Sequence, residues 1–377
     1  MKAVIHIGAP KTGSSTIQEF LFRNTEALAA QGFRFRRNVE GRGSQYEYPL
    51  ASLARMGRLL PGEEEQIRYS STDLAAHKAI GAAVLAELAE NCARWAEPAA
   101  IFSSEHIFPW LLAVDEIKAL DQMFAAHFDD RTYVLYIRNQ EDLIVSEYSE
   151  LLKRGANTRL QTHLNLRLPG LDYEHRVRRW VQAIGRDRFD LRLMEPGFLT
   201  DGDLLADFAG VCGFSIQGLE VPQKINESLS APAAECLRIL NDRVPQLLHD
   251  GQVNPLRAGF VEQLMGMTPD ADPRLGLSPS QQAQVQAAVG ASNERLRQEF
   301  FPSRPVLFSP ASDRPRPARE AVLEQAVDMA GRLVIRLRMG RMPVLTQEQR
   351  AIARKRPPGG VSNGIAPLLG PPAETGE

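Results

Sequence analysis

Residues 2–16 read KAVIHIGAPKTGSST, and this stretch decides the fold. Its first part, KAVIHIG, is apolar and rich in β-branched side chains, which is typical of a buried strand that ends at Gly8. Gly8 and Gly13 then enclose a short loop that contains Lys11. The residues that follow, 15–33, have the apolar spacing of a helix. A strand, a glycine-containing loop and a helix in this order predict the start of a parallel α/β sheet.

Strand and helix patterns continue to alternate along the chain. The segments predicted as strands are 99–108, 131–139 and 188–195, and those predicted as helices are 73–96, 116–128, 141–155, 173–187 and 203–214. Residues 41–66 show no clean period, so we expect loops and short helices there. The alternation predicts a three-layer α/β fold in which helices flank a parallel sheet on both faces.

The C-terminal part differs in pattern, because from about residue 226 the chain reads as helical only. The predicted boundaries are 1–303 for the α/β domain with its helical extension, 304–317 for a linker, 318–345 for a C-terminal helix, and 346–377 for a disordered tail. Residues 318–340 are amphipathic and basic at their end. This helix is expected to pack on the parent domain or on a dimer mate, with weak contact to a membrane surface as the alternative.

Composition narrows the class of protein. Hydrophobic residues are 44% and charged residues 24%, and the formal net charge is −2, which is typical of a globular protein and argues against one that coats nucleic acid. The three cysteines form no C-x-x-C pair. No stretch approaches the roughly 18 apolar residues of a transmembrane segment. We therefore expect a soluble cytoplasmic protein that does not bind nucleic acid.

The loop departs from the usual nucleoside-triphosphate loop, G-x-x-x-x-G-K-[ST]. The glycine spacing is kept, but Ser14 follows Gly13 and the lysine lies inside the loop as Lys11. Backbone N–H groups can surround an oxyanion here, and Lys11 adds a positive charge. The hydroxyl groups that could add donors belong to Thr12, Ser14, Ser15 and Thr16. No Asp closes a neighbouring strand, so a metal-dependent phosphoryl transfer fits poorly and we predict no metal.

The segment PKTGSST, residues 10–16, resembles the 5′-phosphosulfate-binding loop of sulfotransferases that use 3′-phosphoadenylyl sulfate (PAPS). That family has a P-loop-like α/β fold, carries its lysine within the loop and needs no metal. Its second signature is an arginine at a strand end and a serine on the next helix, and Arg138 and Ser146 match it. The resemblance covers roughly 1–300. It implies that the loop holds the phosphosulfate and that Arg138 and Ser146 hold the 3′-phosphate.

Three shorter segments extend the resemblance. RLMEP (192–196) resembles the strand that precedes the family's next helix, although Met194 replaces the usual tyrosine. INESLSA (225–231) and ASNERL (291–296) resemble bacterial carbohydrate-type members. The resemblance therefore implies transfer of a sulfuryl group from PAPS to a hydroxyl acceptor, either a small molecule or a glycan, with a carbohydrate or glycoconjugate favoured.

Sulfuryl transfer to a hydroxyl needs a base, and SSEHIFP (103–109) offers two candidates at a strand end. Relatives use either glutamate or histidine there. Neighbours in a strand point to opposite sides, so only one should face the site. We favour Glu105, while His106 has the better placed ordinary pKa. Lys11 suits neutralisation of the leaving phosphate.

Other interpretations remain open at this point. The fold could be a nucleotide-binding module without transfer, or a P-loop kinase. Arg138 could serve only in a salt bridge to Glu141 or Asp142. Lys153 and Arg154 follow on the same helix and could hold an anionic acceptor, although a solvated surface would look the same in sequence.

Overall fold

The computed structural model describes most of the chain. The described residues are 1–38, 40–41, 43–222, 228–247, 252, 254–266, 274–309 and 319–338. Several predicted features therefore lie outside the described residues: the tail at 346–377, residues 310–317 of the linker, residues 318 and 339–345 of the C-terminal helix, and 225–227 of INESLSA.

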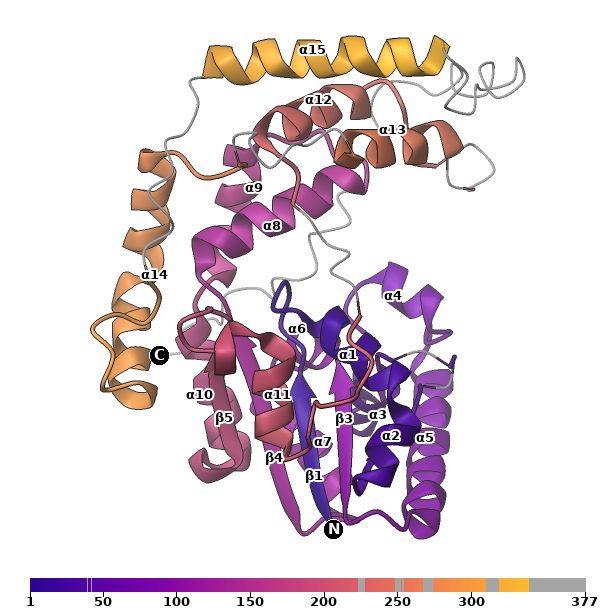
Figure 1. The fold of residues 1–377 in the computed structure, drawn as a ribbon. Coiled ribbons are helices and arrows are strands. Elements are labelled where there is room, and N and C mark those ends of the chain that lie inside the picture. The colour runs from indigo at the N-terminus through magenta and orange to yellow at the C-terminus, as the bar shows by residue number, and fades with distance from the viewer. Residues whose placement is uncertain are drawn as a thin grey trace, which may run out of the picture.

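One parallel sheet forms the centre of the molecule, with strand order β2-β3-β1-β4-β5 (Figure 1). The strands are β1 (Lys2–Ile7), β2 (Phe33–Phe35), β3 (Ala99–Ser104), β4 (Asp130–Ile137) and β5 (Phe189–Leu193). The central strand β1 pairs with β3 on one side and with β4 on the other. The predicted parallel α/β sheet is confirmed.

Side chains of β1 enter two different cores, because successive residues of a strand point to opposite faces. Ile5 and Ile7 belong to the core on one face and Val4 to the core on the other. The first face is covered by α3 (Glu47–Arg55), α7 (Val114–Ala125) and α10 (Tyr173–Ile184), with α5 (Leu74–Arg94) packed on α3. The second is covered by α1 (Ser14–Arg23), α2 (Thr25–Ala30) and α11 (Leu204–Cys212). Burial on both faces explains the nearly continuous apolar run of β1.

The single helix predicted for 15–33 is wrong. The chain forms α1, then α2, then the edge strand β2, which pairs with β3. Asn24 separates the helices, and its side-chain amide donates to the carbonyls of Phe20 and Glu220. The predicted strand 99–108 is also shorter, because β3 ends at Ser104 and a turn leads into α6 (Ile107–Trp110).

A helical part lies beyond the carboxyl ends of the strands (Figure 1). It contains the end of α8 (Gln140–Lys153) together with α12 (Ala231–Asn241), α13 (Pro255–Gly266) and α15 (Arg319–Arg338), which share a separate apolar core. Met329 and Leu333 of α15 are buried in this core, so the apolar face of the C-terminal helix packs on its own chain. Among the described residues, the other α-helices are α4 (Glu63–Arg68), α9 (Leu160–Arg167) and α14 (Pro279–Phe300).

Candidate functional site

The loop after β1 lies directly against the end of β3. The Gly8 N–H donates to the Ser104 carbonyl oxygen at 3.0 Å. A Cβ atom on Gly8 would lie 2.6 Å from the Cα atom of Glu105 and 2.7 Å from the Ser104 carbonyl oxygen, closer than side-chain atoms tolerate. Glycine is therefore required here because two backbones approach closely. The contact fixes the loop beside Glu105.

Two hydroxyl groups of the loop form hydrogen bonds with the backbone of the same loop. Thr12 Oγ1 donates to the Ala9 carbonyl oxygen at 2.8 Å, and Ser14 Oγ donates to the same oxygen at 3.2 Å. Both side chains are buried, whereas Ser15 is exposed and Thr16 is half-buried. The hydroxyl protons of Thr12 and Ser14 thus hold the shape of the loop. What these two residues offer a ligand is their backbone N–H groups.

The backbone of the loop is turned in a way that suits an anion. Lys11 and Gly13 have positive φ angles of 58° and 79°. The left-handed conformation of a non-glycine residue such as Lys11 costs on the order of 1–3 kcal/mol, and such residues are enriched at ligand-binding and active sites. Gly13 precedes α1 without any side-chain cap. The first N–H groups of α1 can therefore bind an anion at the positive end of the helix dipole.

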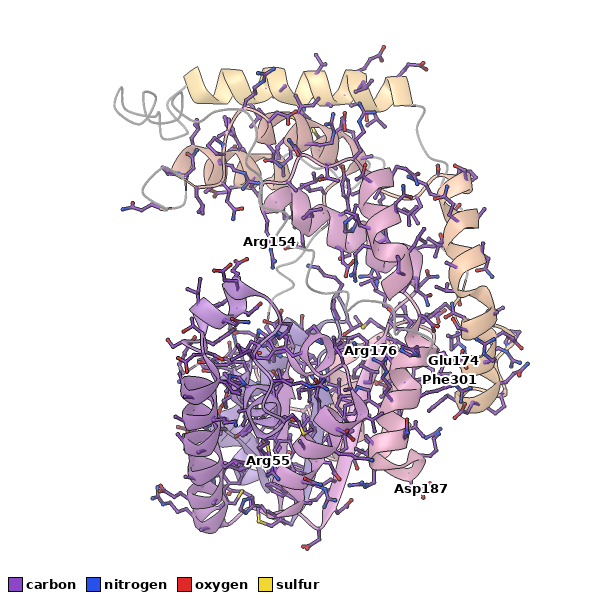
Figure 2. All side chains as sticks on the ribbon, turned by 180° about the vertical axis from the view of Figure 1, so that it is seen from behind. Arg55, Arg154, Glu174, Arg176, Asp187 and Phe301 are labelled. Carbon is purple, nitrogen blue, oxygen red and sulfur yellow. The ribbon has the colours of Figure 1, made fainter. Side chains whose placement is uncertain are left out.

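The Lys11 ammonium group faces the C-terminal half of α8. Its Nζ atom lies 3.7 Å from Oε1 of Glu150, and Nζ of Lys153 donates to that same oxygen at 3.0 Å. Burial lowers the pKa of Lys11, and the Glu150 carboxylate opposes this shift. The charges of Arg154 and Lys153 lower the pKa further. Figure 2 shows Arg154 pointing from the end of α8 toward the α/β layers.

Arg138, which follows β4, reaches the loop. Its Nη1 donates to the Lys11 carbonyl oxygen at 3.4 Å, although the two residues are 127 positions apart. Its other terminal nitrogen lies 3.8 Å from the Asp142 carboxylate, so the salt bridge considered from sequence is present but long. Ser146 is half-buried on α8, one turn before Glu150. The face of α8 that carries Glu150 toward Lys11 therefore also carries Ser146.

The two candidate bases after β3 have different environments. Both lie in the turn after Ser104, so strand alternation does not separate them. Glu105 is exposed. His106 packs between Tyr69 and Trp110, and its Nε2 atom is 3.2 Å from the Tyr69 hydroxyl. Burial lowers the pKa of His106 to about 4, so the ring is neutral at neutral pH.

His6 lies beneath the loop and is packed, as its position on the first strand indicates. It is fully buried, and Nδ1 is 2.8 Å from the Ser103 hydroxyl. Burial lowers the pKa of His6 to about 3. The edge of its ring meets the Phe208 ring of α11. His6 therefore belongs to the core that supports the loop.

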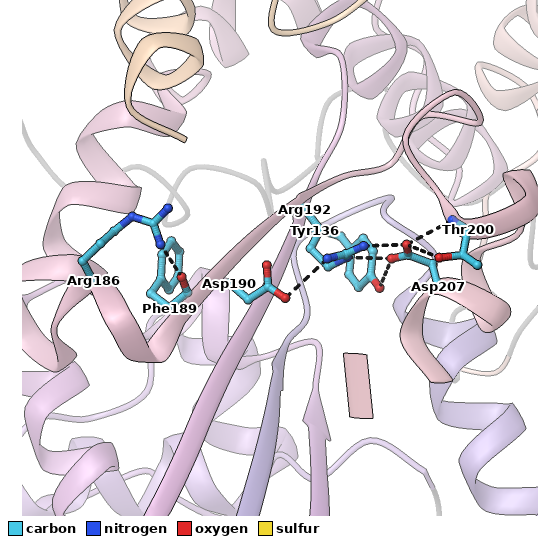
Figure 3. A network of polar contacts seen from close by, with 7 residues as sticks. All are labelled: Tyr136, Arg186, Phe189, Asp190, Arg192, Thr200 and Asp207. Atoms are coloured by element: carbon cyan, nitrogen blue, oxygen red, sulfur yellow. Dashed lines mark hydrogen bonds and ion pairs between the residues drawn. The ribbon is translucent and has the colours of Figure 1, made fainter. Parts of the chain in front are cut away.

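A buried ionic network that the sequence patterns did not predict lies beside β5 (Figure 3). The Arg192 guanidinium donates to both oxygens of Asp207, at 2.7 and 2.6 Å, and the Tyr136 hydroxyl donates at 2.7 Å. Burial alone would raise the pKa of Asp207, but these bonds hold it below its ordinary value. The network joins β4, β5 and α11. Leu204 at the start of α11 fills the space where a Gly13 side chain would project.

The signal for this network was present in RFDLRLME, the segment predicted as the fourth strand. A strand that places charged residues at alternate positions between apolar ones must either expose them or pair them. Its partner, Asp207, lies on a helix whose sequence is otherwise apolar. The two together could have predicted a buried pair, although not its distance from the loop.

Within the described ranges, no three His, Cys, Asp or Glu side chains gather as they would around a metal ion. Over the same residues, no helix is long and apolar enough to cross a membrane. A surface depression of about 280 Å³ lies between α3 and α5, and its lining includes Arg55 and Lys78 but no residue of the loop.

Neither a scan against protein-family models nor a search of curated proteins gave a match. Among solved structures, the chain is similar to a sulfotransferase from Alicyclobacillus acidocaldarius. The sequence identity is 14%, the match covers 80% of this chain and 96% of that chain, and the TM-score is 0.42.

Proposed function

We propose that the chain is a PAPS-dependent sulfotransferase that acts on a hydroxyl acceptor, with a carbohydrate or glycoconjugate as the favoured class. The observation that carries the proposal is the contact between Arg138 and the Lys11 carbonyl oxygen at 3.4 Å. It joins the loop and the arginine at one edge of the sheet, where ligands of parallel α/β folds bind. A donor with two separate phosphate groups needs two such cationic positions.

The residues present fit the donor. The backbone N–H groups of residues 12–16 and the Lys11 side chain would hold the phosphosulfate. The Arg138 guanidinium, 32% exposed and only loosely paired with Asp142, would give the 3′-phosphate a planar two-point contact. Ser146 would add a hydroxyl. When bound, PAPS supplies an activated sulfuryl group on a phosphate leaving group.

The protein's own groups then carry out an in-line displacement. Glu105 takes the proton of the acceptor hydroxyl, the acceptor oxygen forms the new bond to sulfur, and the bond between sulfur and the phosphate oxygen breaks. Lys11 neutralises the negative charge that develops on the leaving phosphate. We assign the base to Glu105 because its side chain is exposed and its backbone lies beside Gly8, whereas His106 packs among aromatic rings.

A thermal-shift titration with 3′,5′-ADP, 5′-AMP and ATP–Mg²⁺ tests the proposal. We expect 3′,5′-ADP to raise the melting midpoint more than 5′-AMP, and we expect Arg138→Ala to remove that difference. Arg332→Ala is a suitable control, because Arg332 also pairs with an aspartate one turn away but lies on α15. A preference for ATP–Mg²⁺ would instead favour the kinase alternative.

A further inference from the structure

The Glu150 carboxylate contacts Lys11, the lysine that an anionic ligand of the loop would need for its own charge. A single oxygen, Oε1, interacts with two ammonium groups: it accepts a hydrogen bond from Lys153 at 3.0 Å and lies 3.7 Å from Lys11. All three side chains are partly buried. Nothing in the proposed chemistry requires a carboxylate at this position.

Glu150 is ionised in this environment. Burial alone would raise the pKa of its carboxyl group, but the Lys153 hydrogen bond and the Lys11 charge hold the pKa below its ordinary value. A negative charge therefore lies next to the lysine of the loop that is proposed to bind an anion. A second negative charge brought next to Lys11 would be repelled by this carboxylate, so Glu150 and a phosphorylated ligand compete for the Lys11 ammonium group.

The two contacts of Glu150 differ in a way that permits exchange. The contact with Lys153 is a hydrogen bond within one helix, three residues apart, and it can persist when a ligand binds. The contact with Lys11 is longer and joins two separate elements. Lys11 can therefore leave Glu150 for a ligand without leaving the carboxylate unpaired, which keeps the cost of the exchange small.

We propose that Glu150 is a positioning residue that competes with the phosphorylated ligand for Lys11. In the free protein it holds the ammonium group against α8, and the ligand must displace it. Glu150 thereby sets the affinity for the donor at a value weaker than the loop and Lys11 alone would give. This inference rests on the proposed function, in which the loop binds a phosphorylated anion.

Calorimetric titration of the full chain with 3′,5′-ADP tests it. Glu150→Gln keeps the shape of the side chain and removes the charge, so we expect binding about threefold to tenfold tighter than wild type. Glu150→Asp keeps the charge and should stay closer to wild type. A residue that merely held the loop in shape would give the opposite sign, because its loss would weaken binding.

Glu235 offers a matched control. It pairs with Arg238 three residues away on α12, and its side chain is 26% exposed, against 29% for Glu150. Glu235→Gln removes the same charge from a similar pair away from the loop, and we expect its affinity to stay within about twofold of wild type.

A double-mutant cycle isolates the competition. In a Lys11→Met background, Glu150→Gln should change affinity by no more than about twofold, because the contested ammonium group is absent. If wild type binds 3′,5′-ADP and Glu150→Gln binds equally or more weakly, the competition is disproved and the proposed function stands. If neither protein binds 3′,5′-ADP, the proposed function itself fails, and this inference fails with it.

Discussion

Two carboxylates of the molecule, Asp207 and Glu150, each interact with more than one donor side chain, yet their surroundings are opposite. Asp207 is fully buried and accepts hydrogen bonds of 2.6–2.7 Å from Arg192 and Tyr136. Glu150 accepts one hydrogen bond and has one longer ion pair, at the border with solvent. The Asp207 contacts are thus hydrogen bonds in the protein interior, whereas one of the two Glu150 contacts is a longer ion pair.

This difference separates charged side chains that stabilise the fold from charged side chains that are available to bind a ligand. A buried ion pair that loses one partner leaves an uncompensated charge. Such a pair therefore stays formed as long as the protein is folded. A partly exposed pair costs little to open. Substitutions at Asp207 should therefore act on stability, whereas substitutions around Lys11 should act on binding and rate.

The largest effect is expected from Asp207→Ala. It removes the acceptor of Arg192 and Tyr136 and should lower the free energy of unfolding by about 3–5 kcal/mol. Denaturant titration measures the loss. Asp328→Ala, which removes an exposed ion pair on α15, should change the same quantity by less than about 0.5 kcal/mol. Similar losses in both variants would contradict the structural role of the Asp207 network.

Lys11→Ala should show the reverse pattern. Sulfuryl transfer should fall about 100-fold to 1,000-fold, because the leaving phosphate loses its compensating charge. Stability should change by less than about 1 kcal/mol, since the pair with Glu150 is partly exposed. Steady-state rates and melting curves of the same preparation measure both. If the variant loses stability while its folded fraction keeps full activity, Lys11 stabilises the fold and does not act in the transfer.

Glu105 and His106 lie in the same turn, and we expect one substitution to act on rate and the other on stability. Glu105→Gln should reduce the transfer rate by about 100-fold at unchanged stability, because it removes the exposed carboxylate that we propose as the base. His106→Ala should mainly destabilise the protein, by about 1–3 kcal/mol, because it opens a cavity beside Tyr69 and Trp110. Rate and unfolding measurements on both variants separate the roles. Equal, mild rate losses would mean that the base lies elsewhere.

The smallest effect near neutral pH is expected from titration of the buried histidines. The folded-state pKa of His106 is lowered from 6.5 to about 4, so only the unfolded chain binds a proton between these values. His106 therefore contributes stability that is present above about pH 6.5 and is lost as pH falls toward about 4. Melting midpoints across this range should fall less steeply in His106→Gln. An unchanged slope would show that the ring is not buried in neutral form.

Local patterns were enough to predict the sheet and the loop. The apolar run of β1 and the glycines around Lys11 are signals that extend over only a few neighbouring residues. Arg138 follows a strand whose pattern is equally clear. The edge strand β2 was missed because three residues, Phe33–Phe35, show no usable periodicity. The hydrogen bond between its neighbour β3 and the loop depends on tertiary approach.

The environments of single side chains could not be predicted in the same way. In sequence, Glu150 and Lys153 form an ordinary helical pair, and only the fold brings Lys11 to the same carboxylate. Likewise, His106 is neutral because Tyr69 and Trp110 surround its ring, and Tyr69 comes from a segment that carries no motif. Burial and charge at this site arise from contacts between elements far apart in the chain.

The most direct test of the central claim is transfer of label from radiolabelled PAPS to a pool of glycan acceptors, with phenols and lipids run in parallel. We expect labelled glycan to appear with wild type and to be lost with Lys11→Ala, while the control Lys78→Ala retains activity. The absence of labelled product from every acceptor class, in a protein that binds 3′,5′-ADP, would contradict the sulfotransferase assignment and leave a nucleotide-binding module.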